Sequence, residues 1–422
     1  MAAERVLIDL DPGGLVWTGL DVDDDLALLV VLALNHTQRL ALHGITVCGG
    51  NAPIKHTGPG LRLLLETAGI TKQDLPFGIA YGYGWRDMTV GWKTLKWFNR
   101  ISPDAPSSEA AADSIIRAAH ASGPRGLTIV TLGPATNLAA ALAKDSSITT
   151  NIRRVVLMGG ELTGGKMCLN FMSDRAAARA VLAAPVPTML VPIQTCAQAA
   201  FTGKDLVHME HKCSCTRHSQ RRGEGVGAAQ TSSPAAACAL VAKMGLQVRV
   251  MPKLVNTYVA PKLPAGSRWT ASNHLRRGFI PWDVVAILAA FEPHRHFGEW
   301  EMHRVGLPRC LAGEPCNGTM AVEPGAQWSG QAAFDAVNWP DSRRTEWRNV
   351  ALVPHKLLDE AALVGRAIDL MCAVPAAKSD GQMPALLLGF VWEVGVVTSA
   401  TLAALLSTIV WLSRRASMAR PS

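Results

Sequence analysis

The chain has 422 residues, of which 49% are hydrophobic and 18% are charged. This composition excludes a disordered, collagen-like or coiled-coil protein. The chain is long enough to bury a large hydrophobic core, so it needs no metal ion or disulfide bond to fold. The formal net charge is +8, but the basic residues are scattered and do not alternate with aromatics, so no nucleic-acid partner is expected. The nine cysteines are an odd number at irregular spacings, so no disulfide framework is expected.

The body alternates β-branched or apolar runs with helical stretches, which predicts an α/β fold with a mostly parallel central sheet flanked by helices. The expected strands are Val6–Leu10, Leu42–Val47, Leu127–Leu132, Arg154–Met158 and Thr188–Ile193. The expected helices are Asp24–Leu34, Gly60–Ala68, Ser108–Ala119, Ala135–Ala143 and Arg175–Ala183. We expect one catalytic domain over residues 4–375, within which the polar stretch 204–236 forms a mobile loop.

The C-terminal part of the sequence predicts a membrane anchor. A polar linker at 376–383 leads into an apolar helix at 384–413, and a basic tail follows at 414–422. The uncharged segment Val394–Leu412 would reach about 28 Å as a helix, which is enough to cross a bilayer core. A strand pattern begins at once at the N-terminus, so no secretory signal is expected. The sequence thus predicts a single-pass C-terminal anchor with a cytosolic catalytic domain, and the alternative is a soluble cytoplasmic protein.

Aspartates gather around the first strand and the first helix. Asp9 and Asp11 share one face of the strand because they are two residues apart, and Asp23, Asp24 and Asp25 open the helix. The helix dipole favours carboxylates at a helix N-terminus, and capping explains one of them. So many carboxylates held close together would repel one another unless a cation neutralised them. Oxygen-only ligands indicate a hard ion, Ca²⁺ or Mg²⁺.

An ordered set of motifs resembles the inosine-uridine type nucleoside hydrolase family. The pattern DxDPG…DD-x-x-A is formed by Asp9, Asp11, Pro12, Gly13, Asp23, Asp24 and Ala27. Similar segments follow in the family's order: GITVCGGN (44–51), LTIVTLGPATNLAAAL (127–142), VVLMGG (155–160), NFMSD (170–174), LVPIQ (190–194) and PWDVVA (281–286). The resemblance covers Arg5 to Pro375 and implies a Ca²⁺-dependent N-ribohydrolase that cleaves ribonucleosides to base and ribose.

The resemblance also implies a role for each matched residue. In the family, one Ca²⁺ binds the attacking water and the ribose hydroxyls. Its ligands here would be the carboxylates of Asp11, Asp24 and Asp283 and the backbone carbonyl of Thr136, with Asp9 as a buried supporting residue. Asp11 would also be the general base. The residues that would bind the substrate are Asp23, Asn51, Asn170, Trp282 and Asp283.

Three departures from the family pattern affect this assignment. The loop at 12–22 is longer than in the family and leaves two registers open, Asp23/Asp24 or Asp24/Asp25; aligning Ala27 with the family's helical Ala selects the first. Cys168 stands where the family usually has a Glu that reaches the sugar. Trp282 replaces the His that acts as general acid in pyrimidine-tolerant members, which resembles the purine-preferring subgroup. Trp282 would then stack on the base, with Trp85, Trp92 or Trp97 on its opposite face.

Two other functions are compatible with parts of the sequence. A nucleoside-binding protein that has lost turnover is suggested by the longer loop and Cys168, although Asp11, Asp24 and Asp283 argue against it. DLDPG also resembles the nucleophile loop of Mg²⁺-dependent DxD phosphatases, but that function leaves the TN, NFMSD and WD segments unexplained. The residues His211, Cys213, Cys215 and His218 match no common zinc-finger spacing. A homo-oligomer is compatible with the sequence.

Overall fold

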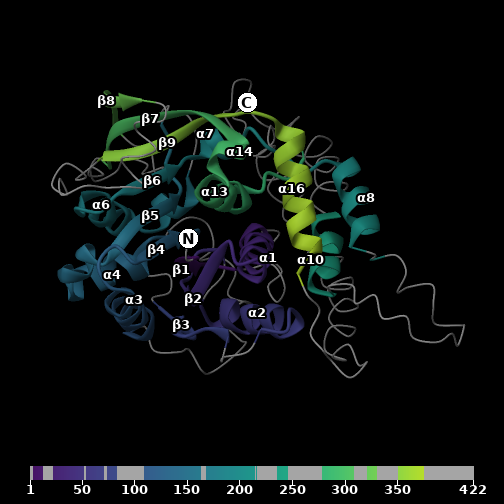
Figure 1. The fold of residues 1–422 in the computed structure, drawn as a ribbon, viewed down its shortest axis with the longest axis horizontal. Helices are drawn as coiled ribbons and strands as arrows, with labels where there is room; N and C mark the ends of the chain where they lie inside the picture. The colour runs from purple at the N-terminus through teal and green to yellow at the C-terminus, as the bar shows by residue number, and fades with distance from the viewer. Residues whose placement is uncertain are drawn as a thin grey trace, which may run out of the picture.

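The structure is a computed structural model that describes residues 3–12, 22–51, 54–70, 74–82, 109–162, 168–213, 215, 235–245, 278–307, 321–329 and 350–374. Its centre is a nine-stranded sheet in the order β3-β2-β1-β4-β5-β6-β9-β7-β8 (Figure 1). The strands are β1 (Glu4–Leu10), β2 (Leu40–Val47), β3 (Ile79–Tyr81), β4 (Leu127–Thr131), β5 (Ile152–Met158), β6 (Thr188–Val191), β7 (Phe297–Gly306), β8 (Ala321–Ser329) and β9 (Val350–Leu357).

Helices flank this sheet, with α3, α4 and α6 together on one side and α1, α13 and α16 together on the other (Figure 1). The α-helices are α1 (Asp23–His36), α2 (Ile54–Thr67), α3 (Glu109–Ser122), α4 (Thr136–Lys144), α5 (Leu169–Ser173), α6 (Arg175–Ala183), α7 (Ile193–Cys196), α8 (Gly203–Lys212), α10 (Ala235–Gly245), α13 (Trp282–Phe291), α14 (Pro293–His296) and α16 (Glu360–Cys372). A 3-10 helix, η4 (Ser146–Thr150), precedes β5.

The predicted mostly parallel sheet is confirmed. The strands from β3 to β9 in the sheet order run parallel, and only β7 is antiparallel to its neighbours β9 and β8. Each of the five predicted strands and five predicted helices is present, with ends shifted by a few residues at most positions. Parallel strands are covered on both faces, so their sequences are continuous apolar runs that a local pattern can identify.

Two central helices, α1 and α13, are buried along almost their whole length. In α1 every residue from Asp23 to Leu34 is buried, and in α13 every residue from Asp283 to Ala290 is buried. A helix that is apolar on all sides can be stable only inside a protein. The two helices pack against each other, and α1 also packs against α16. Their N-termini carry the aspartates that the sequence singles out.

Two disulfide bonds correct the expectation that the chain has no disulfide framework. Cys213, after α8, is bonded to Cys372 at the end of α16, and Cys215 is bonded to Cys238 in α10. They join segments that lie side by side in Figure 1 but are as much as 159 residues apart in sequence. Pairing between such distant cysteines cannot be read from their spacing, which is why the sequence analysis did not predict it.

The predicted mobile loop at 204–236 is also wrong in part. Its first residues form α8, which begins with a capping box between Thr202 and Asp205, and its last residues begin α10. A capping box satisfies two backbone N–H groups at a helix start, and it is visible in the sequence T-G-K-D. Residues 216–234 lie outside the described part of the chain.

The predicted membrane localisation is corrected. Among the residues that the structure describes, no helix is both long and apolar enough to cross a bilayer. The segments predicted as linker, apolar helix and basic tail, 376–383, 384–413 and 414–422, lie outside the described residues. The last described helix, α16, has Leu363, Val364 and Ala367 buried against the body, so it is a docked helix of the globular fold.

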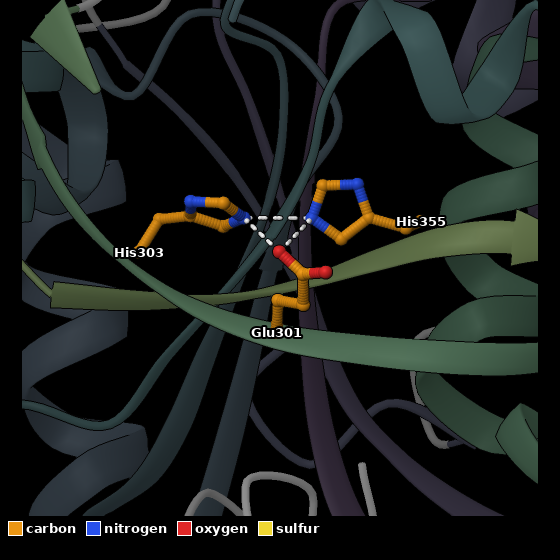
Figure 2. Close-up of side chains that lie close together, drawn as sticks. All are labelled: Glu301, His303 and His355. Carbon is orange, nitrogen blue, oxygen red and sulfur yellow. Dashed lines mark hydrogen bonds and ion pairs between the residues drawn. The ribbon is translucent and has the colours of Figure 1, made fainter. Parts of the chain in front are cut away.

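The antiparallel pair β7–β9 brings together three polar side chains that the sequence analysis did not single out. Glu301 and His303 lie on β7 and His355 lies on β9, and their side chains point toward one another (Figure 2). The Nε2 atoms of His303 and His355 are 2.7 Å apart. Burial, together with the charge of His355, lowers the pKa of His303, and Glu301 partly offsets this effect.

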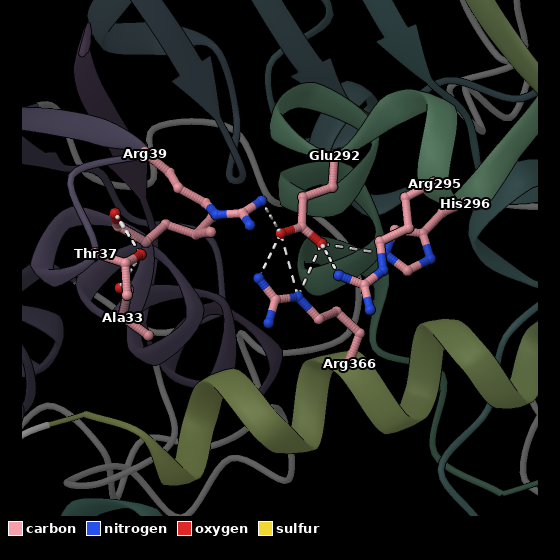
Figure 3. Close-up of polar contacts among 8 residues, drawn as sticks. Ala33, Thr37, Arg39, Glu292, Arg295, His296 and Arg366 are labelled. Atoms are coloured by element: carbon pink, nitrogen blue, oxygen red, sulfur yellow. Dashed lines mark hydrogen bonds and ion pairs between the residues drawn. The ribbon is translucent and has the colours of Figure 1, made fainter.

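Glu292, directly after α13, connects this helix to α16 and to the loop between α1 and β2 (Figure 3). Arg366 of α16 donates three hydrogen bonds to its carboxylate, from Nε to Oε1 at 3.2 Å and to Oε2 at 2.9 Å, and from Nη2 to Oε1 at 2.5 Å. Arg39, between α1 and β2, donates to Oε1 at 2.9 Å. Burial alone would raise the pKa of Glu292, but the hydrogen bonds and the positive charges outweigh it and lower the pKa to about 2.

We expect Glu292→Gln to lower the free energy of unfolding at pH 7 by roughly 3–5 kcal/mol, because it breaks a buried charge network. The folded-state pKa of about 2 lies below the ordinary value of 4.5. The stability from the ionised carboxylate is therefore present above about pH 4.5 and is lost as the pH falls toward 2. Urea unfolding at pH 7, 5 and 3 measures both effects. Glu66→Gln, on an exposed position of α2, is the control and should change little. Equal stability of the two variants across this pH range would contradict the prediction.

Candidate active site

The aspartates lie where the order of the parallel strands reverses. From β1 the chain continues to β2 on one side, and it returns to β4 on the other side of β1. Ligands of open α/β sheets bind at such a switch point, beyond the carboxyl ends of the strands. Asp11 follows β1, Asn51 follows β2, and Thr136 begins the helix after β4. The fold therefore gathers three of the predicted site residues at one edge of the sheet.

Asp9, at the end of β1, is fully buried and holds its neighbours in place. Its Oδ1 accepts hydrogen bonds from Thr46 Oγ1 at 2.7 Å and from Asn137 Nδ2 at 2.8 Å. Burial raises its pKa to about 6, although these two hydrogen bonds act in the opposite direction. Asp9 thereby connects β1, β2 and α4 beneath the site, as expected of a supporting residue. Its inaccessible carboxylate gives no support to a phosphatase nucleophile.

The Asp11 carboxylate is held closely on both sides. Its Oδ2 accepts the backbone N–H of Asn51 at 2.6 Å. A Cβ atom added at Gly50 would lie 1.8 Å from Oδ2, and one added at Gly133 would lie 2.3 Å from Oδ1. Only glycine fits at these two positions while Asp11 keeps its place. Two loops, after β2 and after β4, therefore fix the position of this carboxylate.

Asp23, Asp24 and Asp283 form a compact cluster of buried carboxylates. One carboxylate oxygen from each lies within 4.8 Å of the others. Asp23 and Asp24 occupy the first turn of α1, and Asp283 occupies the first turn of α13. Because α1 and α13 pack side by side, two helix N-termini favour negative charge at the same place.

Asp11 and Asn51 are hydrogen-bonded to this cluster. The backbone N–H of Asp11 donates to Asp24 Oδ1 at 3.0 Å, and Asn51 Nδ2 donates to Asp24 Oδ2 at 2.9 Å. Asp11 is not a member of the three-carboxylate cluster, whereas Asp23 is. Asp23, predicted as a ribose contact, therefore lies with Asp24 and Asp283 as a potential metal ligand, and the metal-binding role of Asp11 stays a prediction.

The donor set fits a hard divalent cation. Buried carboxylates so close together repel one another, and a divalent ion relieves that repulsion. Burial, and after it the negative charges of Asp9, Asp11 and Asp24, raise the pKa of the nearby Cys48 thiol well above its usual value. Carboxylate oxygens are the ligands that Ca²⁺ and Mg²⁺ prefer. A raised thiol pKa also keeps Cys48 protonated and unsuited to binding a metal.

Thr136 and Asn170 lie on the neighbouring elements α4 and α5. Thr136 Oγ1 donates to Asp174 Oδ2 at 2.9 Å, which links the start of α4 to the start of α6. Asn170 Nδ2 donates to the backbone carbonyls of Leu132 and Met158, the latter at 3.2 Å, so it joins the ends of β4 and β5. The metal-binding carbonyl of Thr136 and the ribose contact of Asn170 stay predictions.

Cys168 and Trp282, the two departures from the family pattern, have defined surroundings. The Cys168 thiol is buried and accepts the backbone N–H of Gly160 at 3.0 Å, so it supports the loop after β5. Trp282 is half-buried at the start of α13, immediately before Asp283. Its backbone carbonyl accepts the Cys196 thiol at 3.4 Å. The three tryptophans expected opposite the base, Trp85, Trp92 and Trp97, lie outside the described residues.

Sequence reasoning missed several residues that position the site. Thr46 and Asn137 hold Asp9, and Gly50 and Gly133 enclose Asp11. All four lie within the quoted motifs GITVCGGN and LTIVTLGPATNLAAAL. The glycines were a usable signal, because a glycine directly after a strand often marks a close approach by another group.

Comparison with known proteins identifies related sequences. The family of inosine-uridine preferring nucleoside hydrolases matches residues 6–346. Uridine nucleosidase 1 of Arabidopsis thaliana is 26% identical over 219 residues, which are 49% of this chain and 61% of that protein. The pyrimidine-specific ribonucleoside hydrolase RihB of Escherichia coli is 27% identical over 219 residues, or 50% and 66% of the two chains. The chain therefore spans less than two thirds of the length of these relatives.

Solved structures share the fold. A plant nucleoside hydrolase, PpNRh1, superposes with a TM-score of 0.58 at 18% identity, covering 88% of this chain and 99% of its own. A purine-preferring ribonucleoside hydrolase from Gardnerella vaginalis gives a TM-score of 0.57 at 18% identity, with the same coverage. At such identities the likeness shows the fold, which agrees with the predicted α/β architecture.

Proposed function

The chain belongs to the family of inosine-uridine preferring nucleoside hydrolases, and we propose on that premise that it hydrolyses the N-glycosidic bond of ribonucleosides to free base and ribose. The observation that carries the proposal is the buried cluster of Asp23, Asp24 and Asp283, with Asp11 hydrogen-bonded to it. A carboxylate base next to a carboxylate metal site suits attack by water on a sugar carbon.

The metal is proposed to be Ca²⁺, held by Asp24 and Asp283 with Asp23 or Asp11 and the Thr136 carbonyl. Such an ion, when bound, supplies positive charge that makes a water more acidic and binds ribose hydroxyls. Side chains of the protein would accept the proton and orient the ribose. Asp11 takes the proton from the water, while Asp23, Asn51 and Asn170 orient the ribose. Fixing the sugar near its reactive geometry lowers the entropic part of the barrier to an oxocarbenium-like transition state.

Purine nucleosides are the proposed substrates. The argument rests on Trp282, which stands directly before Asp283 and presents an aromatic ring where pyrimidine-tolerant relatives would have an acid. A purine has the larger ring system to stack on an indole, and stacking does not require a protonated side chain at the leaving base. The curated relatives named above are uridine and pyrimidine nucleosidases, so the base preference calls for a direct comparison.

The test uses the full chain with Ca²⁺ and follows free ribose by a reducing-sugar assay from inosine, guanosine, adenosine, uridine and cytidine. We expect purine-selective ribose release that EDTA abolishes. Faster cleavage of uridine would refute the role of Trp282 and leave the hydrolase function intact. If none of the five yields ribose, although the folded protein binds Ca²⁺, the chain is a nucleoside-binding protein without turnover.

A further inference from the structure

A second cluster of metal-ligating side chains lies on β7 and β9, and it shares no residue with the aspartate site. His303 Nε2 and His355 Nε2 are 2.7 Å apart. Glu301 Oε2 is 3.3 Å from the first of these nitrogens and 3.4 Å from the second. Figure 2 shows the three side chains converging on one point from two neighbouring strands. One donor atom from each residue therefore faces the same small volume.

The strand register explains why these residues meet. Glu301 and His303 are two apart on β7, so they share a face of the sheet. Glu301 pairs with Val353 on β9, and His355 lies two residues beyond Val353, where the register of β7 and β9 shifts between Glu299 and Trp300. This shift leaves His355 as an extra residue between Pro354 and Lys356, so a β-bulge helps to direct its side chain toward the two donors on β7.

The chemistry of this cluster differs from that of the aspartate site. Two imidazole nitrogens and one carboxylate suit a borderline transition-metal ion such as Zn²⁺, whereas oxygen-only sites select Ca²⁺ or Mg²⁺. Donor atoms bound at about 2.0–2.1 Å to a tetrahedral ion are separated by roughly 3.3 Å. The two distances from Glu301 to the histidines already have this length. The closer approach between the histidines needs a small shift of His355, whose side chain is 31% exposed.

We propose that Glu301, His303 and His355 bind a divalent transition-metal ion of the Zn²⁺ type between β7 and β9. The His303 side chain is 9% exposed and that of Glu301 is 49% exposed, so the inner end of the site is buried and its outer end is open to solvent. Three protein ligands with an open fourth position are the usual arrangement of an accessible zinc site. The bound ion would join two antiparallel strands at one end of the large sheet.

Equilibrium dialysis of the metal-free full chain against Zn²⁺, with Ca²⁺ in excess to fill the aspartate site, tests the proposal. Metal analysis gives the number of Zn²⁺ ions retained per chain. The wild type is expected to retain one more than His303→Gln and one more than His355→Gln. Co²⁺ as a spectroscopic probe should give a four-coordinate absorption spectrum that both variants lose.

His208→Gln is the matched control, because His208 is an exposed histidine on α8 outside the cluster. It should retain as much Zn²⁺ as the wild type. His355 is partly exposed, so its variant tests binding even if His303→Gln fails to fold, and thermal unfolding of the metal-free variants checks this. Equal Zn²⁺ retention by the wild type and His355→Gln, or no retention by any of these proteins, overturns the proposal and leaves a hydrogen-bonded imidazole pair.

Discussion

Asp11→Asn is expected to lower kcat for nucleoside cleavage roughly 10²–10⁴-fold, the usual contribution of a general base. Asparagine keeps the size of the side chain but cannot accept a proton at neutral pH. Asp11 Oδ2 is held by the backbone N–H of Asn51 at 2.6 Å, and its own backbone donates to Asp24, so it has a fixed position beside the carboxylate cluster. Steady-state ribose release and nucleoside binding by calorimetry should show lost turnover with most of the binding retained.

Asp113→Asn is the control for this change. Asp113 lies on α3 in an ion pair with Lys144 at 2.7 Å, where both side chains are partly exposed. Surface ion pairs contribute little, so kcat and stability should stay near the wild-type values. If Asp11→Asn keeps a kcat close to that of the wild type, Asp11 is not the base, and the mechanism proposed above is wrong.

Gly50→Ala should also lower kcat, because it displaces the Asp11 carboxylate. The added Cβ would lie 1.8 Å from Asp11 Oδ2, far closer than atoms can approach, so the carboxylate must move. It has little room, because Gly133 lies against its other oxygen. A misplacement of about 1 Å in a catalytic group costs roughly 100-fold in rate. We therefore expect kcat to fall by about that factor, as measured by ribose release.

Gly365→Ala is the matched glycine control. A Cβ at Gly365 meets no neighbouring atom within 4 Å, and the residue lies inside α16. Alanine there should leave kcat unchanged and stabilise the protein by about 0.5–1 kcal/mol, since glycine is unfavourable in a helix interior. Gly133→Ala should behave like Gly50→Ala. If both site variants retain full activity, the position of Asp11 does not control the rate.

The parallel half of the sheet could be predicted from the sequence, because each of its longer strands is a continuous apolar run. The strands β7, β8 and β9 were not predicted, because polar and charged residues interrupt their apolar positions, as in FGEWEMHRVG of β7. β9 pairs with β6 through Met189 and Leu352, which are far apart in the chain. No local pattern specifies such a partner, so the cluster of Glu301, His303 and His355 was invisible before the structure.

The candidate site was predictable where its residues are close in sequence. Asp9, Asp11 and Asp24 lie on one strand and on the helix after it, and the spacing alone indicated a cation site. Asp283 came only from the resemblance to a family, because its position depends on the packing of α13 against α1. That the Asp23 carboxylate lies beside those of Asp24 and Asp283 depends on the same packing, so the sequence could not reveal it.

Ribose release from inosine by the full chain, after chelation and during stepwise return of Ca²⁺, tests the central claim most directly. The buried carboxylates of Asp23, Asp24 and Asp283 are proposed to hold the ion that the reaction needs. We predict that activity is absent after chelation and returns in proportion to Ca²⁺ bound, and that Asp283→Asn regains neither the ion nor the activity. Full activity in chelated protein, or an Asp283→Asn variant as active as the wild type, would contradict the account.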